Sequence, residues 1–214
     1  LEFALTRGGD EIEGLLMLYA TNLSRLETLR DVDQLQLLDF AKFLKYKEGQ
    51  KHVFLFYQRE FIPRLDPRVF ANVLGKYEDR PHIQHGFSDA SGLFRRDISF
   101  DVDLIKRAYA DSSVHIHFLF ISTPAEQIYG IRMKEQSEDI YQSFKEMARA
   151  TGGFFDSSAN PAYLFQNALQ ASENYYLIYY SPKNYQQDGK FKAIKVRVKN
   201  KDYKITHRLG YFAN

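Results

Sequence analysis

Polar and charged side chains follow two apolar runs of the sequence directly, and their types suit binding or catalysis. The first group is Gln58, Arg59 and Glu60, and the second is Ser122 and Thr123. An amide, a guanidinium, a carboxylate and two hydroxyls can bind a partner through hydrogen bonds and charge. They could also serve a hydrolase or transferase, but that chemistry needs a nucleophile placed beside a base, and we find no such pair. The sequence also has no Gly-x-Ser-x-Gly nucleophile elbow and no nucleotide-binding motif.

The two apolar runs, residues 53–57 and 114–121, have the composition of buried strands. A strand that is apolar on both faces belongs in the middle of a parallel sheet covered by helices, and we expect the first run to be the central strand. In open α/β sheets, ligands bind just beyond the carboxyl ends of such strands. The polar groups above are therefore predicted to share one ligand-binding edge.

Helical patterns alternate with strand patterns along the chain. An apolar stripe that begins near Asp33 and ends at Gly49 predicts a helix before the first buried strand. This alternation predicts an α/β fold built on an open sheet. Further helices are predicted over residues 67–74, 101–111 and 137–152 and from 160 onward, and further strands over 154–156 and 175–180.

Three segments stand outside this alternation. Residues 1–20 are predicted to be an edge hairpin, with Ile12–Tyr19 as its second strand. Residues 78–100 have the least regular pattern and are predicted to be a surface insertion. Residues 183–214 are predicted to form a C-terminal antiparallel β ribbon, in which Asp188-Gly189 is a turn that needs positive φ.

Composition limits the class of protein. The 214 residues, 44% of them hydrophobic, suffice for the core of a single domain over 1–214, and a net charge of +2 argues against a nucleic-acid binder. From Lys183 onward there are nine cations and two carboxylates. Because the cations alternate with apolar residues, a solvated sheet face is favoured over a polyanion site. No cysteine is present, and no run approaches a membrane span, so we expect no membrane insertion from this segment.

Two pairs of histidines have the spacing of metal ligands. His115 and His117 alternate on one face of a predicted strand, but no third ligand can be placed with them, so a structural role is favoured. His82 and His85 fall in the irregular segment, where a metal is not favoured either. Four aspartates form a loose acidic group without the spacing of a calcium loop: Asp89, Asp97, Asp101 and Asp103.

Several motifs of the second half of the chain occur in a fixed order. They are Ala150-Thr-Gly-Gly-Phe-Phe-Asp156, the helix start Asn160-Pro161, Tyr175-Tyr-Leu-Ile-Tyr-Tyr-Ser-Pro182, Asp188-Gly-Lys-Phe191, Ile194-Lys-Val-Arg-Val198 and Gly210-Tyr-Phe212. This order resembles the C-terminal half of the von Willebrand factor A-related domains of bacterial exported proteins. Upstream the resemblance is looser: residues 1–30 resemble the edge hairpin and following helix of that family, and residues 52–60 resemble its fourth strand.

The resemblance implies a doubly wound, mainly parallel sheet with helices on both faces and a metal-ion-dependent adhesion site at its carboxyl edge. In that family an Asp-x-Ser-x-Ser loop, a Thr and a closing Asp hold a divalent ion that binds an acidic group of the partner. This sequence contains no Asp-x-Ser-x-Ser, the Thr position falls near Asp33, and the closing Asp falls on Gln58. The site is therefore expected to be degenerate and to hold no cofactor. Mg or Mn is expected only if a strand upstream of Leu1 completes it.

We therefore expect a non-enzymatic, adhesion-type module that binds a protein partner and not a nucleic acid. The resemblance implies an extracytoplasmic location, in the periplasm or secreted. Two alternatives stay open, namely a hydrolase or transferase that uses the same edge, and a scaffold domain that docks through its basic C-terminal ribbon. The sequence does not specify the oligomeric state. The predicted binding edge consists of Asp33, Gln58, Arg59, Glu60, Ser122 and Thr123.

Overall fold

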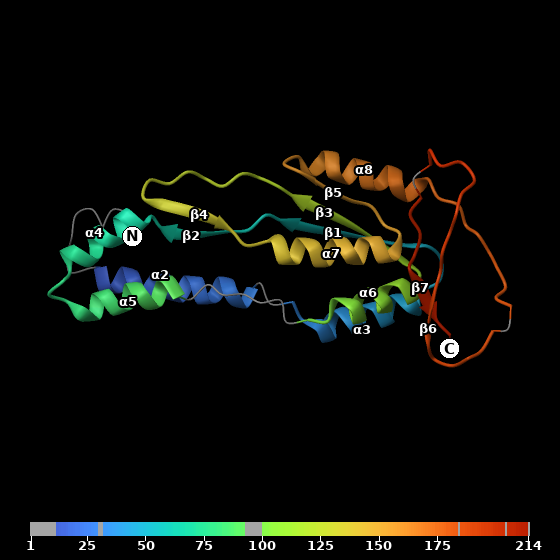
Figure 1. The fold of residues 1–214 in the computed structure, drawn as a ribbon, viewed down its shortest axis with the longest axis horizontal. Helices are drawn as coiled ribbons and strands as arrows, with labels where there is room; N and C mark the ends of the chain where they lie inside the picture. The colour runs from blue at the N-terminus through green and yellow to red at the C-terminus, as the bar shows by residue number, and fades with distance from the viewer. Residues whose placement is uncertain (1–11, 30–31, 93–99, 184, 204, 214) are drawn as a thin grey trace. The chain divides into compact units, whose positions relative to one another are not determined.

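The computed structural model describes residues 12–29, 32–92, 100–183, 185–203 and 205–213 (Figure 1). The chain divides into two compact units, and each is described by itself. The first comprises Leu1–Val32, Glu60–Ser99 and Ala125–Gln136, and the second comprises Asp33–Arg59, Phe100–Pro124 and Ser137–Asn214. The single domain predicted over 1–214 therefore stays a prediction.

The second unit contains a parallel sheet of three strands, in the order β1 (Lys51–Gln58), β3 (Val114–Ile121) and β5 (Phe155–Ser158). This confirms that both long apolar runs form parallel strands. The prediction that the first of them is central is wrong, because β3 lies in the middle and β1 pairs, within the described chain, with β3 alone. The Phe56 side chain of β1 is accordingly 47% exposed.

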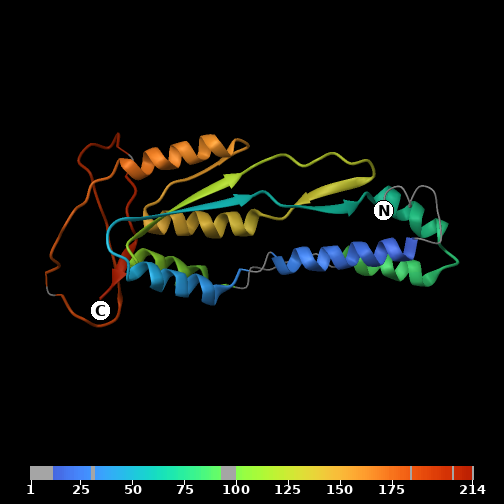
Figure 2. The ribbon, with the colours of Figure 1, turned by 180° about the vertical axis from the view of Figure 1, so that it is seen from behind.

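Helices cover both faces of this sheet, as Figures 1 and 2 show. Successive side chains of a strand point to opposite faces, so neighbouring residues of β3 meet different helices. Phe118 packs on α7 (Glu138–Thr151), whereas Leu119 packs with Leu164 of α8 (Pro161–Glu173). The unit is thus a mixed α/β structure, in which buried side chains of β3 pack on a helix at each face of the sheet.

Three helices of this unit begin at a polar residue whose side chain accepts a backbone N–H. Asp33 precedes α3 (Gln34–Lys45) and Asp101 precedes α6 (Val102–Asp111), each with an accepted hydrogen bond of 3.0 Å, and Asn160 precedes α8. The first N–H groups of a helix have no partner within it, so such residues mark its start. The predicted helices are confirmed here, with α3 packed on α6 and α6 on α7.

Three consecutive residues fix the chain between α7 and β5. The Thr151 hydroxyl accepts the N–H of Ile116 in β3 at 3.0 Å. Gly152 then ends α7 in the left-handed region, with a φ of 73°. A Cβ atom on Gly153 would collide with the carbonyl oxygen of Ile116. The helix can therefore turn into β5 this close to β3 only because the second glycine has no side chain.

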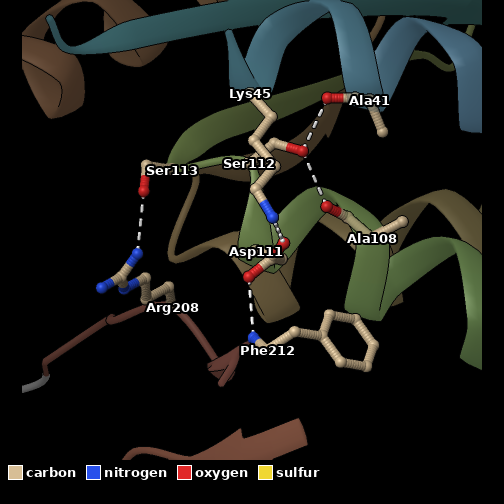
Figure 3. A network of polar contacts seen from close by, with 8 residues as sticks. All are labelled: Ala41, Lys45, Ala108, Asp111, Ser112, Ser113, Arg208 and Phe212. Carbon is tan, nitrogen blue, oxygen red and sulfur yellow. Dashed lines mark hydrogen bonds and ion pairs between the residues drawn. The ribbon is translucent and has the colours of Figure 1, made fainter. Parts of the chain in front are cut away.

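Asp111, at the end of α6, anchors the C-terminal segment (Figure 3). One carboxylate oxygen accepts the backbone N–H of Phe212 at 2.7 Å, and the other pairs with the Nζ of Lys45 at 2.6 Å. Close by, the guanidinium of Arg208 donates to the hydroxyl of Ser113 at 2.8 Å. The contacts of Phe212 and Arg208 hold residues 208–212 against the C-terminal end of α6, which the ion pair with Lys45 links to α3.

The C-terminal ribbon is shorter than predicted. β6 (Phe191–Ala193) pairs antiparallel with β7 (Gly210–Phe212), and Gly189 has the predicted positive φ, at 65°. The prediction of a buried strand over residues 175–180 is wrong, because these residues form no strand and their side chains are exposed. An apolar run becomes a strand only where another strand takes its backbone hydrogen bonds, and the pattern of side chains does not show whether one does.

The first unit corrects several predictions. Residues 12–20 do not form a hairpin strand but belong to the helix α2 (Ile12–Leu29), and residues 1–11 lie outside the described residues. The predicted insertion contains α5 (Pro81–Gly92), which packs on α2. Short apolar runs fit a helix and a strand equally well, so periodicity alone did not separate the two.

A small antiparallel pair completes the first unit. β2 (Phe61–Leu65) pairs with β4 (Ile131–Glu135). The predicted helix after β2 is confirmed as α4 (Pro67–Lys76). The Tyr19 hydroxyl donates to the carbonyl of Pro63 at 2.9 Å and so ties α2 to β2. None of the described helices is long and apolar enough to cross a membrane.

The close approach at Gly153 gives a testable prediction. We expect Gly153→Ala to lower the free energy of unfolding by about 1–3 kcal/mol, because the added methyl group forces α7 away from β3. Gly14→Ala is the matched control, since a Cβ at this exposed position in α2 meets nothing within 4 Å. Urea denaturation should show no loss, or a gain of up to ~1 kcal/mol, for the control. Equal effects of the two substitutions would contradict the structure at Gly153.

Candidate functional site

The carboxyl ends of β1, β3 and β5 meet at one edge of the sheet. Gln58 is paired with Ile121, and Ile121 is paired with Ser158, so the last residues of the three strands form a row. Beyond the strands, the N–H of Arg59 donates to the carbonyl of Ile121 at 2.8 Å, and the N–H of Ser122 donates to the carbonyl of Ser158 at 3.0 Å. Because neighbouring strands lie about 4.8 Å apart, the row is about 10 Å wide.

We call this set the edge row: Gln58, Arg59, Ser122, Thr123 and Ser158. Gln58 and Thr123 are exposed, and the other three are half-buried. The guanidinium carbon of Arg59 lies 5.8 Å from the centre of the Phe120 ring, a cation–π contact that holds the positive charge at this edge. The edge row can thus donate and accept hydrogen bonds, and its charge suits an acidic group.

Ser158 was missed from the sequence because the short strand was predicted to end at residue 156. Its hydroxyl accepts the N–H of Asn160 at 3.1 Å, and the Asn160 side chain accepts the N–H of Tyr163 at the start of α8. A signal was present, since polar residues from Asp156 onward follow an aromatic pair directly. All strands of a parallel sheet have their carboxyl ends at the same edge. The polar residues after this strand could therefore have been predicted to lie beside those that follow the two longer apolar runs.

Two of the predicted site residues have other places in the structure. The carboxylate of Asp33 caps α3, where it accepts the N–H of Gln36 at 3.0 Å. Glu60 belongs to the first unit, where its carbonyl accepts the N–H of Gln136 at 3.1 Å. The structure therefore brings together Gln58, Arg59, Ser122 and Thr123 out of the six predicted residues.

The side chains of the edge row do not suit a divalent cation. They supply an amide, three hydroxyls and a guanidinium, whereas Mg²⁺ and Mn²⁺ prefer sites that include carboxylates, and the charge of Arg59 repels a cation. Across the part of the chain that the structure describes, no group of three or more His, Cys, Asp or Glu side chains could hold a metal ion. The ion that the family resemblance implies therefore does not fit the residues present.

A second polar cluster lies at the opposite end of the sheet, near the start of β1 and β3. The N–H of Phe154 donates to Nδ1 of His117 at 3.3 Å, and Nε2 of His117 lies 2.9 Å from Nδ1 of His52. Because Nδ1 of His117 accepts a hydrogen bond, its proton resides on Nε2, which donates to His52. The ring of His115 packs edge-on against His52, with 5.1 Å between the centroids.

This geometry keeps His117 neutral. Its side chain is only 2% exposed, and burial, assisted by the nearby His52 and His115, lowers its pKa to about 4. Protonation of Nδ1 would also bring its N–H into repulsive contact with the backbone N–H of Phe154, which now donates to that nitrogen. Burial likewise lowers the pKa values of His52 and His115. The three histidines thus form a hydrogen-bonded and packed part of the interior rather than a reactive centre.

Comparison with known proteins gives no relative for this chain. No family model matches it, and neither a curated protein nor a solved structure does.

The state of His117 predicts a loss of stability in acid. The unfolded chain binds a proton near pH 6.5, whereas folded His117 does so only near pH 4, so lowering the pH through this window favours unfolding. We expect His117 to account for about 3 kcal/mol of lost unfolding free energy between pH 6.5 and pH 4. Urea denaturation across this range, compared between the wild type and His117→Gln, measures it.

The control for this experiment is His85→Gln, which replaces an exposed histidine of α5. It should leave the pH dependence of stability unchanged, whereas His117→Gln should flatten it. The same slope in all three proteins would contradict the neutral, buried state of His117.

Proposed function

We propose that this chain is a non-enzymatic, von Willebrand A-like module that binds a protein partner through the edge row. The proposal rests on one observation: the register of the three parallel strands places hydrogen-bonding residues next to one another at one edge of the sheet. Ligands of open α/β sheets bind at this edge. The order of the motifs between residues 150 and 212 supports the resemblance to that family. We include in the proposal a doubly wound sheet and an extracytoplasmic location, which the resemblance implies.

The chemistry of the edge row favours an acidic group on the partner. Gln58 and Thr123 are exposed and can each donate and accept hydrogen bonds. Arg59 adds a half-buried positive charge beside the Phe120 ring, and this charge attracts a carboxylate. In the resembled family a metal ion binds the acidic group of the partner, and here we propose that the charge of Arg59 attracts that group instead.

Site-specific photo-cross-linking tests this proposal. A photoreactive residue at Thr123 should give one discrete protein adduct in an extract of the source cells, because this exposed position adjoins the row. A second substitution, Gln58→Arg, should reduce the adduct at least about tenfold, since it places a larger, charged side chain in the interface; tenfold corresponds to about 1.4 kcal/mol. Quantitative mass spectrometry of the adduct provides the readout.

The matched control is Gln166→Arg, the same change at an exposed position of α8. It should leave the adduct from Thr123 intact. An adduct that is equally sensitive to both substitutions, or that forms equally well from a photoreactive residue at 166, would refute partner binding at the edge row.

Metal binding gives an independent prediction. We expect titration calorimetry to show no sub-millimolar binding of Mg²⁺ or Mn²⁺ to the whole chain, because the edge row lacks carboxylates. Gln58→Asp, run in parallel, shows how far one restored carboxylate improves the site. Sub-millimolar binding by the wild type that Gln58→Ala abolished would show that the edge row holds an ion after all.

A further inference from the structure

An aromatic run on the surface of the second unit has no role in the edge row. Residues 175–180 read Tyr-Tyr-Leu-Ile-Tyr-Tyr, and within them Tyr176 is 96% exposed, Tyr179 85% and Ile178 70%. At the start of the run, the ring of Tyr175 lies 6.4 Å from that of His52, and at its end burial and the neighbouring Tyr211 raise the pKa of Tyr180. The side chains between these two tyrosines are all exposed to solvent.

Exposed cations accompany this run. Residues 174–203 contain seven cations and two carboxylates, and one of the carboxylates, Asp188, is paired with Lys192 at 2.7 Å. In Figures 1 and 2, residues 175–183 and 194–203 lie at the same end of the unit, beside β6 and β7. The six other cations all have exposed side chains: Lys183, Lys190, Lys195, Arg197, Lys199 and Lys201.

We propose that residues 174–183 and 185–203 form a docking surface for an anionic phospholipid membrane, on which the chain lies without spanning it. Tyrosine suits the boundary between lipid headgroups and acyl chains, because its ring is apolar and its hydroxyl is polar. Leu177 and Ile178 add aliphatic area between the tyrosines. The surrounding cations supply attraction to anionic headgroups.

The identity of the cations favours a membrane over a protein as the partner. Five of the six are lysine and one is arginine. Lysine is depleted in protein–protein interfaces, where tyrosine and arginine are enriched. A mobile ammonium group on a long stem adapts instead to a layer of lipid phosphates, where binding requires charge rather than a fixed geometry.

This surface is distinct from the edge row. α8 runs antiparallel to the strands, so residues 174 onward begin at the end of the sheet where β1 and β3 start, as the contact between Tyr175 and His52 shows. The edge row lies where those strands end. The inference therefore does not depend on the proposed function, and either can fail alone.

Vesicle sedimentation with the whole chain tests the inference. In about 0.1 M salt, the chain should bind vesicles of phosphatidylcholine with phosphatidylglycerol and not vesicles of phosphatidylcholine alone, and about 0.5 M salt should weaken binding through screening. Lys195→Gln with Lys199→Gln should lower the partition coefficient at least about tenfold, because each lysine contributes several-fold near an anionic surface. Tyr176→Ser with Tyr179→Ser should lower it to a similar extent by removing apolar area.

The control pair is Lys42→Gln with Lys134→Gln, two exposed lysines outside the surface, which should leave vesicle binding unchanged. Absence of binding to anionic vesicles, equal binding to neutral ones, or an equal loss in the control pair would overturn the inference. Sedimentation velocity covers one further outcome: a dimer of the wild type that Tyr176→Ser with Tyr179→Ser dissolves would assign the surface to a second copy of the chain instead.

Discussion

The close contact between the backbone of Gly153 and the carbonyl of Ile116 sets the arrangement of the second unit. β5 pairs with β3 only from Phe118 onward, so the residues before it must lie against β3 without a regular ladder. Instead, residues 151–154 form individual hydrogen bonds with polar groups of β3. The hydroxyl of Thr151 takes the N–H of Ile116, and the backbone of Phe154 donates to His117 and accepts from Phe118. The glycine makes this possible, since any side chain there would separate the helix and the strand.

The same contact determines where the edge row lies. Once Phe154 is fixed beside His117 and Phe118, the register of β5 follows. This register pairs Ser158 with Ile121, which is itself paired with Gln58 on its other side. It also determines the proton position of His117, which must accept from Phe154 and therefore donates to His52. The motif Ala150–Asp156 thus has a structural explanation in this fold: it joins a helix to a strand at minimal separation.

Those parts of the fold that depend on local patterns could be predicted from the sequence. Asp33 and Asn160 mark helix starts, and the run 114–121 is apolar enough to be a buried strand in any arrangement. Predictions failed where a distant partner decides the structure. The apolar pattern of Ile12–Tyr19 fits both the period of a helix and that of a strand. The run 175–180 has the composition of a strand but, among the described residues, no neighbouring strand to pair with. The edge row was found through Gln58 and Ser122, whereas His52 joins His117 only through the strand register, which a single sequence does not show.

The polarity of a parallel sheet separates the two surfaces of the second unit. All three strands run in one direction, so residues at and just beyond their carboxyl ends form the edge row, while the helices return the chain to the amino ends. The long segment after α8 therefore starts opposite the edge row, and it carries the exposed tyrosines and cations. A module that lay on a membrane through this segment would present its edge row away from the lipid. The direction of the strands would then orient the binding site, without any contact between the two surfaces.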